Sequence, residues 1–122
     1  MEQDPRISIA PIDQMRTVEK THALYHVIYE GNTSFRMVLR QTLRPRQSSQ
    51  IHIHDFAPEL YIVLQGLLQI KTDLALLDVP EGWLAYVPAG VAHGVSNPSI
   101  EKVAVSLILL GSEYTKESVR PY

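Results

Sequence analysis

The sequence of 122 residues contains no cysteine. A disulfide framework and a thiolate metal site are therefore both excluded. Hydrophobic runs are also short, far below the ~20 residues that a membrane-spanning helix needs. We therefore expect no partner in a membrane.

Basic clusters are missing as well, because lysine and arginine are scattered and the formal net charge is −2. This distribution argues against a nucleic-acid partner. The first residues, Met1–Pro5, lack the apolar core of a secretory signal, so the expected location is cytoplasmic. The length fits one domain. We expect an N-terminal arm at 1–20, a barrel at 22–110 and a C-terminal tail at 111–122.

What the chain does contain is a series of short apolar segments separated by glycine, proline and polar turn residues. Segments of this length and spacing predict an all-β sandwich or barrel. None of them has the period of a long amphipathic helix. The strands are expected at 25–29, 35–43, 51–54, 60–64, 67–71, 74–79, 83–87, 91–96 and 103–110.

The segment 35–43 alternates most clearly. Side chains two residues apart in a strand share one face. The apolar face should be inside the barrel, and it includes one polar residue. The members of this face are Phe35, Met37, Leu39, Gln41 and Leu43. Arg36 and Arg40 share the opposite face, where they could clamp a carboxylate, remain solvated or contact a second subunit.

Three histidines and one glutamate form the most informative pattern. His52 and His54 are two residues apart and point the same way if they lie on a strand. Glu59 follows after a segment long enough to turn, and His93 lies in a separate turn. Imidazole and carboxylate together suit a divalent Fe, Mn, Ni, Cu, Co or Zn ion. His22 and His26 lie outside this pattern, and neither is expected to bind the metal.

These residues resemble the two sequence motifs of the cupin superfamily. The second motif matches at all its defined positions, and the first matches at its two histidines, its glutamate and Gly66. The first motif departs at its opening glycine, where this chain has Arg46. The second motif is carried by Gly82, Pro88, Gly90, His93 and Asn97. The resemblance implies a double-stranded β-helix, or jelly-roll, barrel. It also implies one metal per chain and a homodimer.

Two further residues are candidates for a direct chemical role. Tyr61 lies two residues beyond Glu59 and could donate to a substrate or act as an acid, or could be a core tyrosine. Gln41 could orient a substrate or a metal-bound water, or could sit wetted at the end of its strand. Asp55 has the opposite parity to His54, which limits it to supporting a ligand from outside.

The function is expected to follow from the metal. The chain resembles small cupin dioxygenases, which implies iron and a small organic substrate, and the apolar interior favours a hydrophobic or aromatic one. A non-redox isomerase, cyclase, lyase or decarboxylase remains the alternative, in which the metal polarises a carbonyl. A ligand-binding cupin without catalysis is the third possibility.

Overall fold

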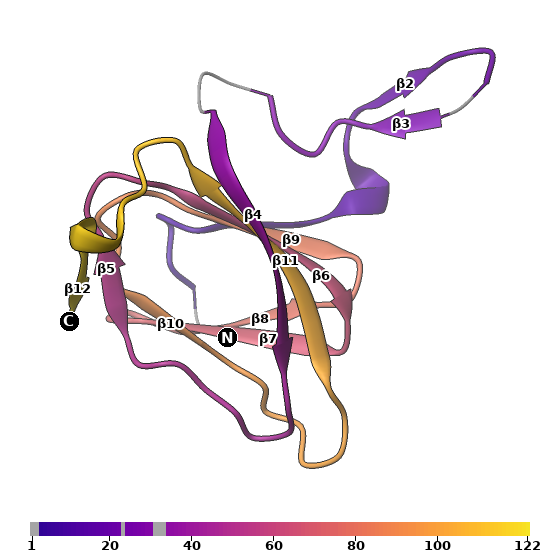
Figure 1. Ribbon diagram of the computed structural model, residues 1–122. Helices are drawn as coiled ribbons and strands as arrows, with labels where there is room; N and C mark the ends of the chain where they lie inside the picture. The colour runs from indigo at the N-terminus through magenta and orange to yellow at the C-terminus, as the bar shows by residue number, and fades with distance from the viewer. Residues whose placement is uncertain (1–2, 23, 31–33) are drawn as a thin grey trace.

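The computed structural model describes residues 3–22, 24–30 and 34–122. In this part of the chain, β-strands form two five-stranded sheets and a separate two-stranded hairpin (Figure 1). Two short 3-10 helices are η1 (Ile12–Gln14) and η2 (Lys116–Ser118). The strands are β1 (Ser8–Pro11), β2 (Thr17–Glu19), β3 (Leu24–His26), β4 (Phe35–Leu43), β5 (His52–His54), β6 (Glu59–Gln65), β7 (Leu67–Thr72), β8 (Leu76–Pro80), β9 (Trp83–Val87), β10 (His93–Ser96), β11 (Ala104–Gly111) and β12 (Val119–Pro121).

Sheet 1 has the strand order β1-β9-β6-β11-β4, and sheet 2 has the order β12-β5-β10-β7-β8. Every pair of neighbouring strands is antiparallel. Apolar side chains from both sheets form one core between them. The predicted all-β jelly-roll architecture is confirmed. No helix in the described residues is long and apolar enough to cross a membrane.

The strand register explains which side chains reach the core. On β6, Tyr61 pairs with Ile108 of β11, which pairs in turn with Leu39 of β4. Directly paired residues share a face of the sheet. Tyr61 and Ile108 are both buried, so this row faces the interior.

The interior face predicted for β4 is confirmed in direction but not in burial. Leu43 at the end of the strand is buried, whereas Met37 and Leu39 are 38% and 42% exposed. The reason is position, because β4 is the last strand of sheet 1 and, within residues 3–22, 24–30 and 34–122, only β11 pairs with it. A side chain at a sheet edge can point inward without being covered.

The predicted limits of the barrel differ from those in the structure. β1 lies in the predicted arm but pairs with β9, and β12 lies in the predicted tail but pairs with β5. The strand predicted at 25–29 is β3, which pairs with β2 outside both sheets. Segments at both ends of the chain thus belong to the sheets, and the hairpin does not.

An ionic network fixes the N-terminal segment to the turn after β7. The side chain of Asp4 is buried and accepts hydrogen bonds from Arg6 at 2.7 Å and from the Thr72 hydroxyl at 2.8 Å. Arg6 also pairs with Asp73 at 2.5 Å. The Arg6 guanidinium and the Thr72 hydroxyl outweigh the effect of burial and hold the pKa of Asp4 well below its usual range.

Candidate metal centre

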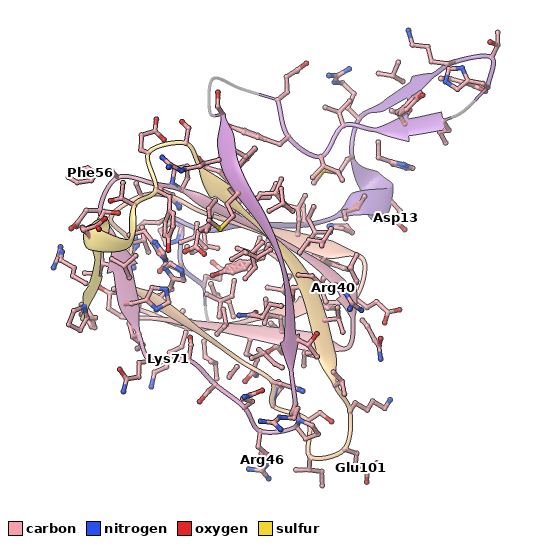
Figure 2. The ribbon with its side chains drawn as sticks, in the orientation of Figure 1. Asp13, Arg40, Arg46, Phe56, Lys71 and Glu101 are labelled. Carbon is pink, nitrogen blue, oxygen red and sulfur yellow. The ribbon has the colours of Figure 1, made fainter. Side chains whose placement is uncertain are left out.

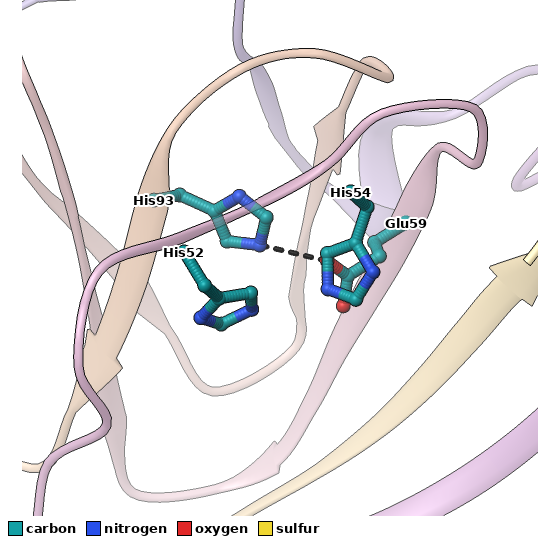
Figure 3. Close-up of side chains that lie close together, drawn as sticks. All are labelled: His52, His54, Glu59 and His93. Carbon is teal, nitrogen blue, oxygen red and sulfur yellow. Dashed lines mark ion pairs between the residues drawn. The ribbon is translucent and has the colours of Figure 1, made fainter. Parts of the chain in front are cut away.

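The four residues of the histidine and glutamate pattern come together at one place between the sheets (Figure 3). His52 and His54 are on β5, Glu59 begins β6 and His93 begins β10. His93 pairs directly with His52 across the two strands. One nitrogen or oxygen atom from each residue lies within 4.8 Å of the others. Of the four, only His52 is not fully buried.

Backbone contacts hold the ligand loops in register. Gly90 has a φ of 84°, a left-handed conformation that favours glycine, and its N–H donates to the carbonyl of His54 at 2.8 Å. The turn before His93 is thereby tied to the strand that carries the other two histidines. This gives the second-motif glycine a physical role in assembling the centre.

Hydrogen bonds to backbone carbonyls set the orientation of two imidazoles. Nδ1 of His52 lies 2.9 Å from the Gln50 carbonyl, and Nδ1 of His93 lies 2.9 Å from the Val91 carbonyl. A carbonyl only accepts, so each Nδ1 must carry the proton. In the neutral ring, Nε2 is then left with its lone pair, which is the form that binds a metal.

The contacts around Glu59 show that a cation fits here. Its Oε1 lies 2.7 Å from Nε2 of His93 and 2.9 Å from Nε2 of His54. Among the described residues, Oε1 has no well-formed hydrogen bond, and Nδ1 of His54 is also buried without a partner. A carboxylate oxygen facing imidazole lone pairs needs a positive charge between them, either a proton or a metal.

The ionisation of the cluster follows from the same contacts. Burial by itself would raise the pKa of Glu59, but His54 and His93 outweigh it and hold this pKa well below the usual range. Burial would lower the pKa of His93, but the Glu59 carboxylate raises it. Burial lowers the pKa of His52. Glu59 is therefore a carboxylate, the form that a divalent cation requires.

Tyr61 lies against the cluster and not in free space. Its hydroxyl donates to Oε2 of Glu59 at 2.9 Å and lies 3.3 Å from Nε2 of His93. Burial, together with the Glu59 charge, raises the pKa of Tyr61 well above its ordinary value, so the phenol keeps its proton. The hydrogen bond from the hydroxyl fixes the direction of the carboxylate. Its predicted part in proton transfer stays a prediction.

Gln41 is not brought to the cluster. Its register row contains Ser106 of β11 and Val63 of β6, four residues beyond Glu59. Four residues of strand span about 13 Å. Its Oε1 is buried with no hydrogen-bond partner in the part of the chain that the structure describes, so Gln41 faces the interior with an unused acceptor. A substrate-orienting role stays a prediction.

The C-terminal segment supports the centre in a way that the sequence pattern did not indicate. β12 pairs with β5 along its whole length, and the Tyr114 ring lies 5.7 Å from that of His54. Asp55 pairs with Arg120 at 2.9 Å, so its supporting role is to anchor this segment. The only available signals were an aromatic and a basic residue in a polar tail.

The turn before β5 explains how the chain tolerates its departure from the first motif. Arg46 has a φ of 66°, the left-handed conformation in which glycine is favoured. Its N–H lies within hydrogen-bonding distance of the Asn97 and Ser99 carbonyls, at 3.1 and 3.0 Å. Arg46 and Glu101 lie at the same end of the barrel (Figure 2). The glycine conformation is thus kept without the glycine.

Comparison with known proteins agrees with this geometry. The family model of the Cupin domain matches residues 39–109, more than half of the chain. The chain belongs to the cupin family. A search of curated proteins by sequence found no match for this cupin.

Solved structures share the cupin fold at low sequence identity. One is a predicted oxalate decarboxylase from Thermotoga maritima, with a TM-score of 0.59, 21% identity and coverage of 63% of this chain and 66% of that one. Another is dTDP-6-deoxy-D-glucose-3,5-epimerase from Legionella pneumophila, with a TM-score of 0.69, 13% identity and coverage of 98% of this chain and 73% of that one. A third is a 3,4-ketoisomerase from Thermoanaerobacterium thermosaccharolyticum, with a TM-score of 0.66, 12% identity and coverage of 96% of this chain and 88% of that one. The cluster and the family match support a bound metal without indicating which one.

Proposed function

We propose that this cupin is a metal-dependent dioxygenase that acts on a small hydrophobic or aromatic molecule. One divalent transition metal, with iron favoured over Mn, Ni, Cu, Co or Zn, would be held by His52, His54, Glu59 and His93. Such a metal supplies Lewis acidity and, as Fe(II), the redox chemistry that O₂ requires. Four protein ligands leave positions open in a five- or six-coordinate shell.

The observation that carries this proposal is the lack of a free proton-transfer group inside the barrel. Among the described residues, the fully buried ionisable side chains outside the four-residue cluster are Asp4 and Tyr61. The Asp4 carboxylate accepts hydrogen bonds from Arg6 and Thr72, and the Tyr61 hydroxyl donates its hydrogen bond to Glu59. Isomerisation and epimerisation need a positioned base or acid. Oxygen chemistry relies on the redox properties of the metal and does not require a separate side chain that transfers a proton.

The interior walls support an apolar substrate. Glu59 shares a register row with Leu110 and Met37, and Tyr61 shares the next row with Ile108 and Leu39. The residues that face inward on β4, β6 and β11 include no lysine or arginine. A phosphorylated substrate would need such cations. The chain would orient the substrate by these walls and keep water from the reacting atoms.

The non-redox alternative is a metal-dependent isomerase, cyclase, lyase or decarboxylase. Its specific support is the fold similarity to proteins named as an oxalate decarboxylase, an epimerase and a ketoisomerase. In that case a metal would supply Lewis acidity to a carbonyl, and Tyr61 would move the proton. A ligand-binding cupin without turnover is the third possibility.

Two measurements separate these functions. Elemental analysis of protein purified anaerobically without added metal should give about one iron per chain. Oxygen uptake should then depend on a substrate drawn from a panel of small aromatic compounds, and it should vanish in His54→Ala. His22→Ala is the matched control, because His22 is exposed on the hairpin. Turnover of the same panel without O₂ would refute the dioxygenase and favour the alternative.

A further inference from the structure

The two sheets separate on the side of the barrel where β1 and β8 lie. β1 is the last strand of sheet 1 and β8 is the last strand of sheet 2, and no strand in the described part of the chain joins them. A hollow of about 740 Å³ lies between these two edges. Ligand pockets of proteins usually measure ~300–1,000 Å³. The hollow is therefore large enough for a small organic molecule.

The walls of the hollow are apolar side chains that point inward. Ile9 pairs with the fully buried Ala85 of β9, and Trp83 lies on the same face as Ala85, two residues before it. Leu77 pairs with Ile70 of β7, which is fully buried as well. Ile9 and Trp83 are only half-buried although they point inward, because they line the hollow. The space between the sheets is thus not filled on this side.

The hollow is a different place from the candidate metal centre. Neither the four candidate ligands nor Tyr61 lines it. Ile9, Ala85 and Tyr61 follow one another across β1, β9 and β6, so the backbone at Tyr61 lies two strands, or about 10 Å, from that at Ile9. A molecule in the hollow is therefore separated from the metal centre by the row that contains Ala85 and Tyr61.

One carboxylate at the rim of the hollow is available to a ligand. Oδ1 of Asp78 accepts a hydrogen bond from the Gln69 amide at 2.8 Å, and Asp78 has no ion-pair partner among the described residues. Asp4, the other carboxylate that lines the hollow, is paired with Arg6. Lys71 lies one row away on the outer face of sheet 2 and does not line the hollow. The charge at the rim therefore favours a cationic ligand.

The strand edges beside the hollow do not suit an added strand. β1 ends at Pro11 and β8 ends at Pro80, and Pro5 also lines the hollow. Proline has no N–H to donate to a neighbouring strand, and prolines at a sheet edge oppose strand addition. A small molecule therefore fits this place better than an extended peptide does.

We propose that this hollow is a second ligand site, which binds a small aromatic amine in its protonated form. The ring lies against the Trp83 indole and the aliphatic walls, and the ammonium group reaches the Asp78 carboxylate at the rim. Burial of the ring supplies most of the affinity. The carboxylate and the face of the indole both attract the cation and supply the selectivity. The site goes beyond the proposed function, because it neither contains nor requires the metal.

The experiment follows the fluorescence of Trp83, the single tryptophan of the chain, during a titration. The probe is biphenylmethylamine, and biphenylmethanol and biphenylacetate are its neutral and anionic analogues. The amine should change the emission in a saturable way, with a Kd below about 1 mM. The alcohol should bind about fivefold more weakly, because it lacks the charge, and the acetate should bind more weakly still.

Two variants test the two parts of the site. Asp78→Asn should abolish the preference for the amine over the alcohol and leave the binding of the alcohol unchanged. Ile9→Phe places a larger side chain in the hollow and should weaken the binding of both probes about tenfold. The matched control is Glu101→Gln, which makes the same change in net charge at an exposed position outside the hollow. It should bind the probes like wild type, and circular dichroism shows that each variant is folded.

Three results would overturn the proposal. The first is a titration of wild type with the amine that leaves the Trp83 emission unchanged. The second is equal affinity of wild type for the amine and the acetate. The third is an affinity for the amine that is the same in Asp78→Asn and Glu101→Gln, because the carboxylate at the rim would then have no part in binding.

Metal content separates this result from the proposed function. The affinity for the amine should be the same in chelator-treated and metal-loaded wild-type protein, because no candidate metal ligand lines the hollow. An affinity that follows the metal content would place the probe at the metal centre and would overturn the second site. A failure to detect oxygen uptake would refute the dioxygenase and leave the binding of the amine unaffected.

Discussion

β5 and β4 are built in opposite ways, although the chain runs directly from one to the other. β5 has three residues, has paired strands on both sides, and carries two histidines of the candidate metal centre. β4 has nine residues, five consecutive exposed positions and one paired neighbour in the described structure. The short strand is enclosed and the long one is open.

This difference separates two tasks, the holding of a metal and the presentation of a binding surface. Ligands that hold a metal need fixed directions, which paired strands and backbone hydrogen bonds provide. A surface that receives a substrate or a second subunit needs uncovered apolar side chains. β5 has the fixed side chains that the first task requires, and β4 has the exposed apolar side chains that the second would use. Substitutions on the two strands should therefore have different consequences.

The largest effect is expected from His54→Ala on β5. His54 contributes one of four convergent ligand atoms, and Glu59 would lose one of its two imidazole neighbours. Losing a ligand should weaken metal binding by more than the 10–100-fold typical of losing a supporting residue. Metal content after dialysis and chelator competition measure this. Full occupancy in the variant would contradict the assignment of His54.

The second effect concerns β1, the other edge strand of sheet 1, which the network of Asp4 secures. Asp4→Asn should lower the free energy of unfolding at pH 7 by about 2 kcal/mol, because Arg6 and Thr72 lose a buried charged acceptor. Urea unfolding of wild type and variant at the same protein concentration measures the difference.

The pH dependence of this difference has a definite sign. The pKa of Asp4 is held below its usual range in the folded protein. A lowered carboxyl pKa contributes stability that is fully present above the unfolded pKa of about 4 and is lost as the pH falls through the folded pKa. The gap between wild type and Asp4→Asn should therefore close below about pH 4. A gap that is constant with pH would exclude the charge as its cause.

The sequence predicted the centre better than it predicted the edges. The alternation at His52 and His54 and the two motifs were local patterns, and the strands that carry them formed where expected. The pairing of β12 with β5 joins segments about 65 residues apart, and no period in a polar tail specifies it. Likewise, the alternation of apolar residues in β4 predicted that Leu39 points inward, but it did not predict that Leu39 is exposed. Exposure depends on which other segments pack over the side chain, and a local pattern does not contain this information.

A smaller effect is expected from Tyr61→Phe. The change removes the hydrogen bond to Oε2 of Glu59 and leaves the ring in the core. Freeing the carboxylate should weaken metal affinity about tenfold, with the metal still bound at saturation. The spectrum of the Co(II)-substituted protein should also shift, as the carboxylate can rotate. If both affinity and spectrum match wild type, Tyr61 does not position Glu59.

The smallest effect on stability is expected from Leu39→Ala on β4. Leu39 and Ile108 are register partners on the same face, but Ile108 is buried and Leu39 is not. Leu39→Ala should therefore change the free energy of unfolding by less than about 0.5 kcal/mol, whereas Ile108→Ala should cost about 2–5 kcal/mol. Once a substrate is known, Leu39→Ala should raise KM. A loss of stability in Leu39→Ala as large as that in Ile108→Ala would mean that β4 is covered in solution on its inner face. The contrast between the open strand and the enclosed one would then fail.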